Sequence, residues 1–141
     1  MAGEASKELY RRFVDGIINN GHFELVDEVF SPDYLDHSAP PGAPTGLDGV
    51  RAVFQMFRSA FPDIHFTIVK MVAEDDMVAT FVRGEGTQQG PFLGLAPTGK
   101  HVGWNSTGFF RVQDGKIVEH WGVPDFFSLM NQLTGGPGGQ H

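Results

Sequence analysis

The 141-residue sequence contains no cysteine. This absence excludes disulfide scaffolds, thiolate nucleophiles, iron–sulfur clusters and cysteine-ligated zinc. Basic residues are also scarce, because ten Lys and Arg stand against 17 Asp and Glu and give a net charge of −7. An acidic domain is a poor electrostatic partner for phosphate backbones or anionic lipid. The composition therefore predicts neither a nucleic-acid-binding nor a membrane-associated protein.

Long apolar runs and cofactor motifs are missing as well. No stretch approaches the ~20 apolar residues that span a bilayer, and the polar start, MAGEASKE, lacks the features of a signal peptide. We therefore expect a cytoplasmic protein. No Gly-rich phosphate cradle and no H-E-x-x-H pair occurs, so no nucleotide cofactor is implied. A metal site would need His37, His101 and His120 to converge with a carboxylate, and this is only weakly supported.

Glycine, proline and phenylalanine are abundant instead. The chain has 19 Gly, 9 Pro and 13 Phe, with two Trp and two Tyr. A Gly and Pro excess often indicates disorder, but so many aromatic residues favour a packed interior. We expect one domain over residues 1–133, with sharp turns around an apolar core, and a flexible Gly-rich tail over residues 134–141.

The hydrophobic period changes from helical to alternating along the chain. The spacing predicts helices over residues 6–20, 22–30, 47–60 and 126–133. It predicts a short extended piece at 34–37 and strands over residues 64–73, 77–88, 101–113 and 116–123. This order indicates the α+β class, with an antiparallel sheet and helices gathered on one face. A strongly curved sheet closed by helices forms a cone, and the interior of a cone is a pocket.

Several short motifs, in this order and spacing, carry a family resemblance. They are Tyr34-Leu-Asp-His37, Ala60-Phe-Pro-Asp63, Gly86-Thr87 with Gly90 and Gly94, Pro97-Thr-Gly99, Asp114-Gly-Lys-Ile-Val-Glu-His-Trp121, Asp125, and Gln132-Leu133. Over residues 6–133 the chain resembles the SnoaL-like polyketide cyclases, within the wider superfamily of nuclear transport factor 2 and ketosteroid isomerase. The resemblance implies the cone fold and a cofactor-free aldol ring closure on a hydrophobic, carbonyl-bearing substrate. One acidic residue near the end of the last strand then acts as general acid and base.

Asp125 is the first candidate for that acid. Strand alternation places it on the same face as Glu119, Trp121 and Val123, and we expect the large Trp121 to point into the cone. A carboxylate beside aromatic rings loses hydration, which raises its pKa toward neutrality. The alternative is that Asp125 caps the last helix. A buried Asp125 favours catalysis, whereas an exposed, purely capping Asp125 favours a small-molecule-binding module without catalysis.

Two histidines are the other catalytic candidates. His37 follows Tyr34 at the expected pocket mouth, where a neutral imidazole could bind a substrate carbonyl. Its neighbour Asp36 is interpreted as pinning the following loop. His120 lies on the opposite strand face from Trp121, where it either ties the sheet to the helices or reaches the pocket through a bulge.

The candidate substrate-binding residues are aromatic or carboxamide side chains. Trp104 and Asn105 are adjacent on one strand and must face opposite sides, and the sequence leaves open which of them lines the pocket. The other expected wall residues are Tyr34, Phe54, Phe57 and Trp121.

Other functions of this fold remain as alternatives. Epoxide hydrolysis needs an Asp–Arg–Asp set, but the residues two positions after Arg83 and Arg111 are Glu85 and Gln113. A ketosteroid isomerase needs a buried Tyr, and the two tyrosines both lie in the N-terminal third. Hydroxylation and simple ligand binding also occur on this scaffold. The aromatic open face of the sheet predicts a homodimer, or a tetramer built from it.

Overall fold

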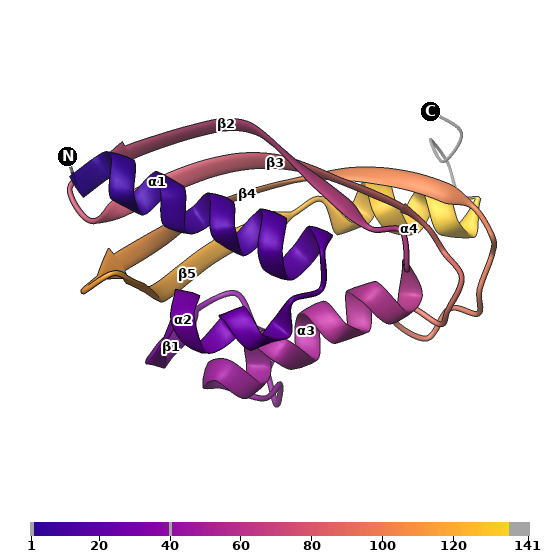
Figure 1. Ribbon diagram of the computed structural model, residues 1–141. Coiled ribbons are helices and arrows are strands. Elements are labelled where there is room, and N and C mark those ends of the chain that lie inside the picture. Colours follow the sequence, from indigo (N-terminus) through magenta and orange to yellow (C-terminus); the bar gives the residue numbers. More distant parts are fainter. Residues whose placement is uncertain (1, 40, 136–141) are drawn as a thin grey trace.

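The computed structural model describes residues 2–39 and 41–135 and has the expected α+β architecture (Figure 1). The helical elements are α1 (Ala2–Arg12), the π-helical η1 (Phe13–Asn19), the short 3-10 turn η2 (Phe23–Leu25), α2 (Val26–Val29), α3 (Gly46–Ala60) and α4 (Phe126–Thr134). The strands are β1 (Phe30–Asp36), β2 (His65–Glu74), β3 (Met77–Thr87), β4 (His101–Gln113) and β5 (Lys116–Pro124). Each predicted helix and strand is present, with ends that shift by a few residues.

The five strands form one open sheet in the order β1-β5-β4-β3-β2. The long strands β2, β3 and β4 bend over α1 and α3, which lie on one face of the sheet (Figure 1). The pairs from β2 to β5 are antiparallel as expected, but β1 pairs in parallel with β5. The sheet is therefore mixed rather than wholly antiparallel. The parallel pair adds an edge strand from the N-terminal half beside the last strand of the chain.

The β4–β5 hairpin sets which residues face the helices. Its turn residues Asp114 and Gly115 both have positive φ, 52° and 76°, which the tight turns that favour Asp-Gly require. The register then pairs Arg111 with Glu119, with a bulge between Arg111 and Val112. Beyond the bulge, alternation is regular to the end of β5.

Two apolar clusters fill the concave face of the sheet. The first lies under α1 and η1, where Phe13 packs edge-on against Phe30 and Phe54. The second lies near α4, where Trp104 stacks on Phe57 and contacts Phe61. Both ends of the expected internal pocket are thus packed with aromatic side chains.

The C-terminal end of the domain is fastened to β4. The Gln132 carboxamide donates to the Gly103 carbonyl at 2.7 Å and accepts from its N–H at 3.1 Å. Helix α4 includes Thr134 and ends at Gly135, whose φ of 72° suits a glycine cap. The rest of the predicted tail, residues 136–141, lies outside the described residues. None of the described helices is long and apolar enough to cross a membrane.

Both tyrosines are buried, and this predicts a pH-dependent stability. Burial raises the pKa of Tyr10 to about 12 and raises that of Tyr34 above its ordinary value. Below pH 10 both phenols are neutral in the folded and unfolded states, so this contribution is fully present. Above pH 10 only the unfolded state ionises, so the free energy of unfolding should fall by up to about 3 kcal/mol for Tyr10 as the pH rises toward 12.

An ultraviolet titration of tyrosinate measures this directly, because the chain has only these two tyrosines. The native protein should show little tyrosinate at pH 10, whereas the same protein in denaturant should be half ionised there. Half ionisation of the native protein at pH 10 would contradict the burial of both rings.

Candidate functional site

The concave face of β4 and β5 carries His120 rather than Trp121. Directly paired residues share a face, and Phe110 pairs with His120 while the exposed Phe109 pairs with Trp121. The expectation that Trp121 points into the cone is therefore wrong. Trp121 lies on the outer face, and His120 faces the helices, stacked on Phe110 at 4.3 Å between ring centroids.

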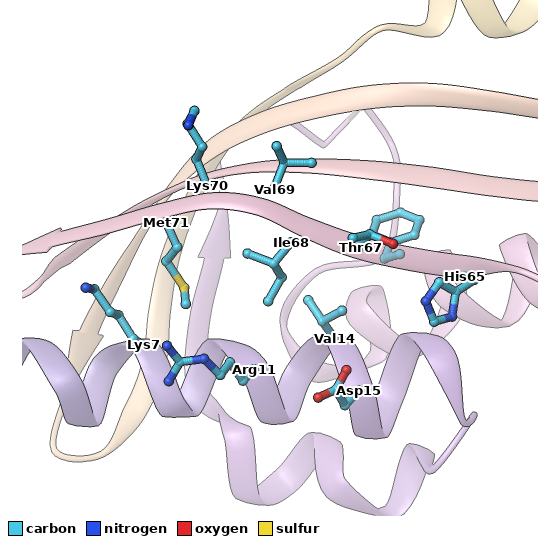
Figure 2. Close-up of a pocket in the computed structure, with 11 residues that line it drawn as sticks. Lys7, Arg11, Val14, Asp15, His65, Thr67, Ile68, Val69, Lys70 and Met71 are labelled. Carbon is cyan, nitrogen blue, oxygen red and sulfur yellow. The ribbon is translucent and has the colours of Figure 1, made fainter.

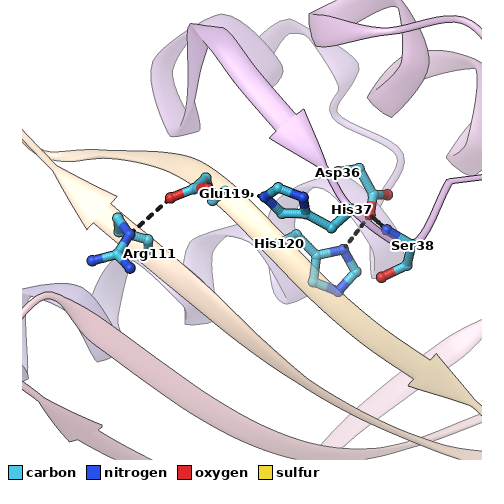
Figure 3. Close-up of polar contacts among 6 residues, drawn as sticks. All are labelled: Asp36, His37, Ser38, Arg111, Glu119 and His120. Atoms are coloured by element: carbon cyan, nitrogen blue, oxygen red, sulfur yellow. Dashed lines mark hydrogen bonds and ion pairs between the residues drawn. The ribbon is translucent and has the colours of Figure 1, made fainter.

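His120 forms a pair with Asp36 at the end of β1 (Figure 3). The parallel register places Asp36 beside His120, and His120 Nδ1 lies 3.2 Å from Asp36 Oδ1. Because a carboxylate only accepts hydrogen bonds, Nδ1 carries the proton. In the neutral ring Nε2 then holds a lone pair, and no hydrogen bond from the described residues reaches it. The His120 side chain is 22% exposed.

Two glycines make room for the imidazole. A Cβ at Gly122 would lie 2.5 Å from His120 Nε2, and one at Gly108 would lie 3.2 Å from the same atom. These glycines share the concave face with the half-buried Ser106. Between the two aromatic clusters the sheet therefore presents small residues around a histidine.

The Asp36 carboxylate is ionised by its surroundings. Burial acts to raise its pKa, but the hydrogen bond and charge of His120 and the hydrogen bonds of Ser38 outweigh burial, so the pKa lies below its ordinary value. The Ser38 N–H donates to Asp36 Oδ1 at 2.8 Å. Asp36 thus pins the following loop, as predicted, and also orients His120, which was not predicted.

His37 points to the other side of the sheet from Asp36. Its Nε2 lies 2.9 Å from Glu119 Oε2, and its ring stacks on Trp121 with centroids 4.7 Å apart (Figure 3). This places His37 on the outer face, and not in the expected position facing the pocket. The hydrogen bonds from His37 and from Arg111 lower the pKa of Glu119.

Asp125 caps α4 and is exposed. Its side chain accepts the Ser128 N–H at 3.0 Å, and its own N–H donates to the Asn105 carbonyl at 2.8 Å. By the criterion set from the sequence, an exposed cap favours a binding module over catalysis by this residue. The concave His120 is the better placed acid–base group.

The predicted substrate-binding residues divide between the two faces. Trp104 is buried on the concave side, and Asn105 is exposed on the outer side, which settles the choice that the sequence left open. Phe57 and Tyr34 are buried in the core, and Phe54 is half-buried between the two clusters. Phe54 packs against both clusters, with its ring near those of Phe13 and Phe57.

Arg111 lies between two carboxylates that the sequence did not pair with it. Its Nη1 is 2.7 Å from Asp76 Oδ2, and its Nε is 2.8 Å from Glu119 Oε1. The set resembles the acid–arginine–acid arrangement sought for epoxide hydrolysis, but it lies on the outer face and away from the concave residues. Residues 2–39 and 41–135 contain no cluster of three potential metal ligands.

A hollow of about 470 Å³ lies between α1 and the edge strand β2 (Figure 2). Ile68 and Met71 point from β2 toward the N-terminal helices, where Lys7 and Arg11 of α1 and Asp15 of η1 lie opposite them. Lys7 and Arg11 each have an acidic partner on the same helix, Glu4 and Glu8. The charges around this hollow are nearly balanced, so it does not select a ligand of either sign.

Comparisons with known proteins agree with this fold. Residues 8–133 match the model of the family described as SnoaL-like polyketide cyclase. Nogalonic acid methyl ester cyclase from Streptomyces nogalater is 27% identical over 123 residues, which cover 82% of this chain and 87% of that protein. TsrD from Streptomyces laurentii superposes with a TM-score of 0.85 at 26% identity, covering 92% of this chain and 95% of its own. IdmH from Streptomyces antibioticus has a TM-score of 0.80 at 31% identity, covering 92% and 98%.

Proposed function

Because the chain belongs to the SnoaL-like polyketide cyclase family, we propose that it catalyses a cofactor-free intramolecular aldol cyclisation of a hydrophobic, carbonyl-bearing substrate. The enzyme class is then a lyase- or isomerase-type cyclase. The observation that carries this proposal is the His120–Asp36 pair, whose Nε2 lies on the concave face without a protein partner among the described residues.

The proposed reaction needs one proton carrier. His120 Nε2 removes a proton from a substrate carbon that flanking carbonyls make acidic, and the resulting enolate carbon attacks a second carbonyl of the same molecule. A carbon–carbon bond forms, the carbonyl π bond opens to an alkoxide, and the imidazolium returns its proton to that oxygen. Product and substrate are isomers, so no co-reactant is required. Asp36 keeps Nδ1 protonated and stabilises the imidazolium between the two proton transfers.

A non-catalytic binding module is the second candidate, and the exposed, capping Asp125 favours it. The small residues around His120 would then contact a ligand that does not react. Asp125 also remains a competing proton carrier, because the family resemblance implies an acid at this position. The binding module predicts no turnover, whereas proton transfer by Asp125 predicts turnover that is lost when Asp125 is replaced.

A turnover assay with nogalonic acid methyl ester tests the proposal, since a relative is named as its cyclase. The expected result is a product of unchanged mass and altered retention, formed without added metal or nucleotide. Saturable binding with no conversion of this ester and of a panel of related β-dicarbonyl polyketides would support the binding module and overturn the cyclase proposal.

We also propose a homodimer formed through the outer face of the sheet. Phe109 is 53% exposed and Val123 is 70% exposed, and they lie near Trp121 and Phe81 on adjacent strands. Such a contiguous apolar surface is typical of an interface between subunits. Light scattering should give twice the 15.4 kDa chain mass.

The double variant Phe109→Glu with Val123→Lys should shift the protein to the monomer at the same concentration. Replacement of the exposed Ala52 by Glu on α3, which covers the opposite face of the sheet, serves as a control for added surface charge, and it should leave the dimer intact. A wild-type protein that is monomeric at all concentrations would show that this face has no second copy as its partner.

A further inference from the structure

Two groups of side chains meet at the end of β1. One is the His120–Asp36 pair on the concave face, and the other is the outer-face network of His37, Glu119, Arg111 and Trp121. Asp36 turns its side chain to His120 on the concave face, and His37 turns its side chain to Glu119 on the outer face. The two residues share a peptide bond, so the same stretch of backbone orients both side chains. Among the strands of the described residues, β1 pairs with β5 alone, and its register is irregular between Phe30 and Leu35.

The outer network extends across the surface of the sheet from the end of β1 to the β2–β3 turn. Glu119 contacts His37 through Oε2 and Arg111 through Oε1, and Arg111 continues to Asp76 at the β2–β3 turn. Trp121 covers the face of the His37 ring, with the rings only 9° from parallel, and the Arg111 guanidinium lies 5.9 Å from the Trp121 ring centre. His37 is therefore held by a hydrogen bond and a stacking contact at once.

The backbone completes this attachment. The His37 N–H donates to the His120 carbonyl at 2.9 Å, and the Gly122 N–H donates to the Ser38 hydroxyl. These two hydrogen bonds fix the register of the β1 end along β5. The side chains of Asp36 and His37 add one contact on each face, because they project on opposite sides of the same strand.

We propose that His37, Glu119 and Trp121 are positioning residues, which act through the β1 end to hold Asp36 against His120 Nδ1. This inference rests on the proposed acid–base role of His120. A carboxylate that drifts from Nδ1 no longer fixes the tautomer, and Nε2 is then protonated in part of the molecules. Small misplacements of this kind lower turnover strongly.

The test compares Glu119→Ala and Trp121→Ala with Glu85→Ala. Glu85 forms a similar pair with His101, at 3.0 Å and also on the outer face, but this pair has no link to Asp36. We expect the first two variants to lower kcat about tenfold or more with KM within twofold, and Trp121→Phe to restore most of kcat because it retains the stacking. Glu85→Ala should retain both parameters.

Nitrogen-15 NMR of the histidine rings provides a readout without substrate. The Nδ1–H signal of His120, identified by its loss in His120→Asn, should broaden or shift in Glu119→Ala and Trp121→Ala and stay unchanged in Glu85→Ala. An unchanged signal in both network variants would overturn the positioning role even if the wild type proves to have no turnover. Absent turnover with a shifted signal would instead overturn the proposed function and retain the positioning role.

Discussion

A His120→Asn variant should fold normally and lose cyclisation activity by about 10²- to 10⁴-fold, the usual contribution of a positioned acid–base group. The Asn amide can still donate toward Asp36, so the β1–β5 junction should persist. The variant lacks any group equivalent to the basic Nε2. We therefore expect the loss in kcat, with KM and the melting temperature near the wild-type values. Steady-state kinetics together with a thermal melt measure both quantities.

Two further variants separate His120 from its competitors. Gly122→Ala keeps every ionisable group but places a methyl carbon 2.5 Å from the present position of Nε2, so the ring must move and kcat should fall. Asp125→Asn keeps an oxygen that can accept the Ser128 N–H while removing the acid. It should retain most activity. Loss of turnover in Asp125→Asn with full activity in His120→Asn would assign the proton transfer to Asp125 instead.

The order of helices and strands was predictable because the spacing of apolar residues along the sequence differs between a helix and a strand. Strand β4 matches the predicted residues 101–113, and the Asp114-Gly115 turn has the positive φ values that its sequence indicates. The same alternation also grouped Glu119, Trp121 and Val123 correctly on one face of β5. What failed was the assignment of that face to the interior.

That failure has a physical cause in the amphipathic character of Trp121. Its size suggested burial in the core, but here its ring is covered by the His37 imidazole and approached by Arg111, so it is half-buried on the outer face. The interior is filled instead by Trp104 and Phe110 of β4, which leaves space on β5 for His120 and glycine.

The role of Asp36 could not be read from the sequence for a different reason. Asp36 and His120 are 84 residues apart, and they meet only because β1 pairs in parallel with β5. The alternation of apolar residues identifies a strand, but it does not say which strand pairs with it. A strand that follows helices can join either edge of a sheet. The pairing of Glu119 with Arg111 also needed the structure, since equal distances from the turn would pair Arg111 with Val118, and the bulge between Arg111 and Val112 shifts the register by one residue.

The loop over residues 88–100 is organised by one fully buried side chain, Gln88, with 0% exposure. Its Nε2 donates to the Gly90 and Leu95 carbonyls at 3.1 and 3.4 Å, and its Oε1 accepts from the Thr98 N–H and hydroxyl at 3.1 and 2.8 Å. All four bonds close this single loop. The loop also inserts Phe92, which is fully buried against Phe57 and Phe61.

Gln88→Leu should therefore lower the free energy of unfolding by about 3 kcal/mol, because it removes the four hydrogen bonds of the carboxamide and takes this donor from the carbonyl of the buried Gly90, at nearly unchanged volume. For a domain of this size the melting temperature should fall by about 10 °C. Chemical denaturation measures the loss, and amide exchange at Thr98 should accelerate more than exchange in β3. The neighbouring Gln89 is exposed, so Gln89→Ala is a matched control that should change stability by less than about 0.5 kcal/mol. Equal stability of the two variants would mean that the loop is held by Phe92 rather than by the carboxamide of Gln88.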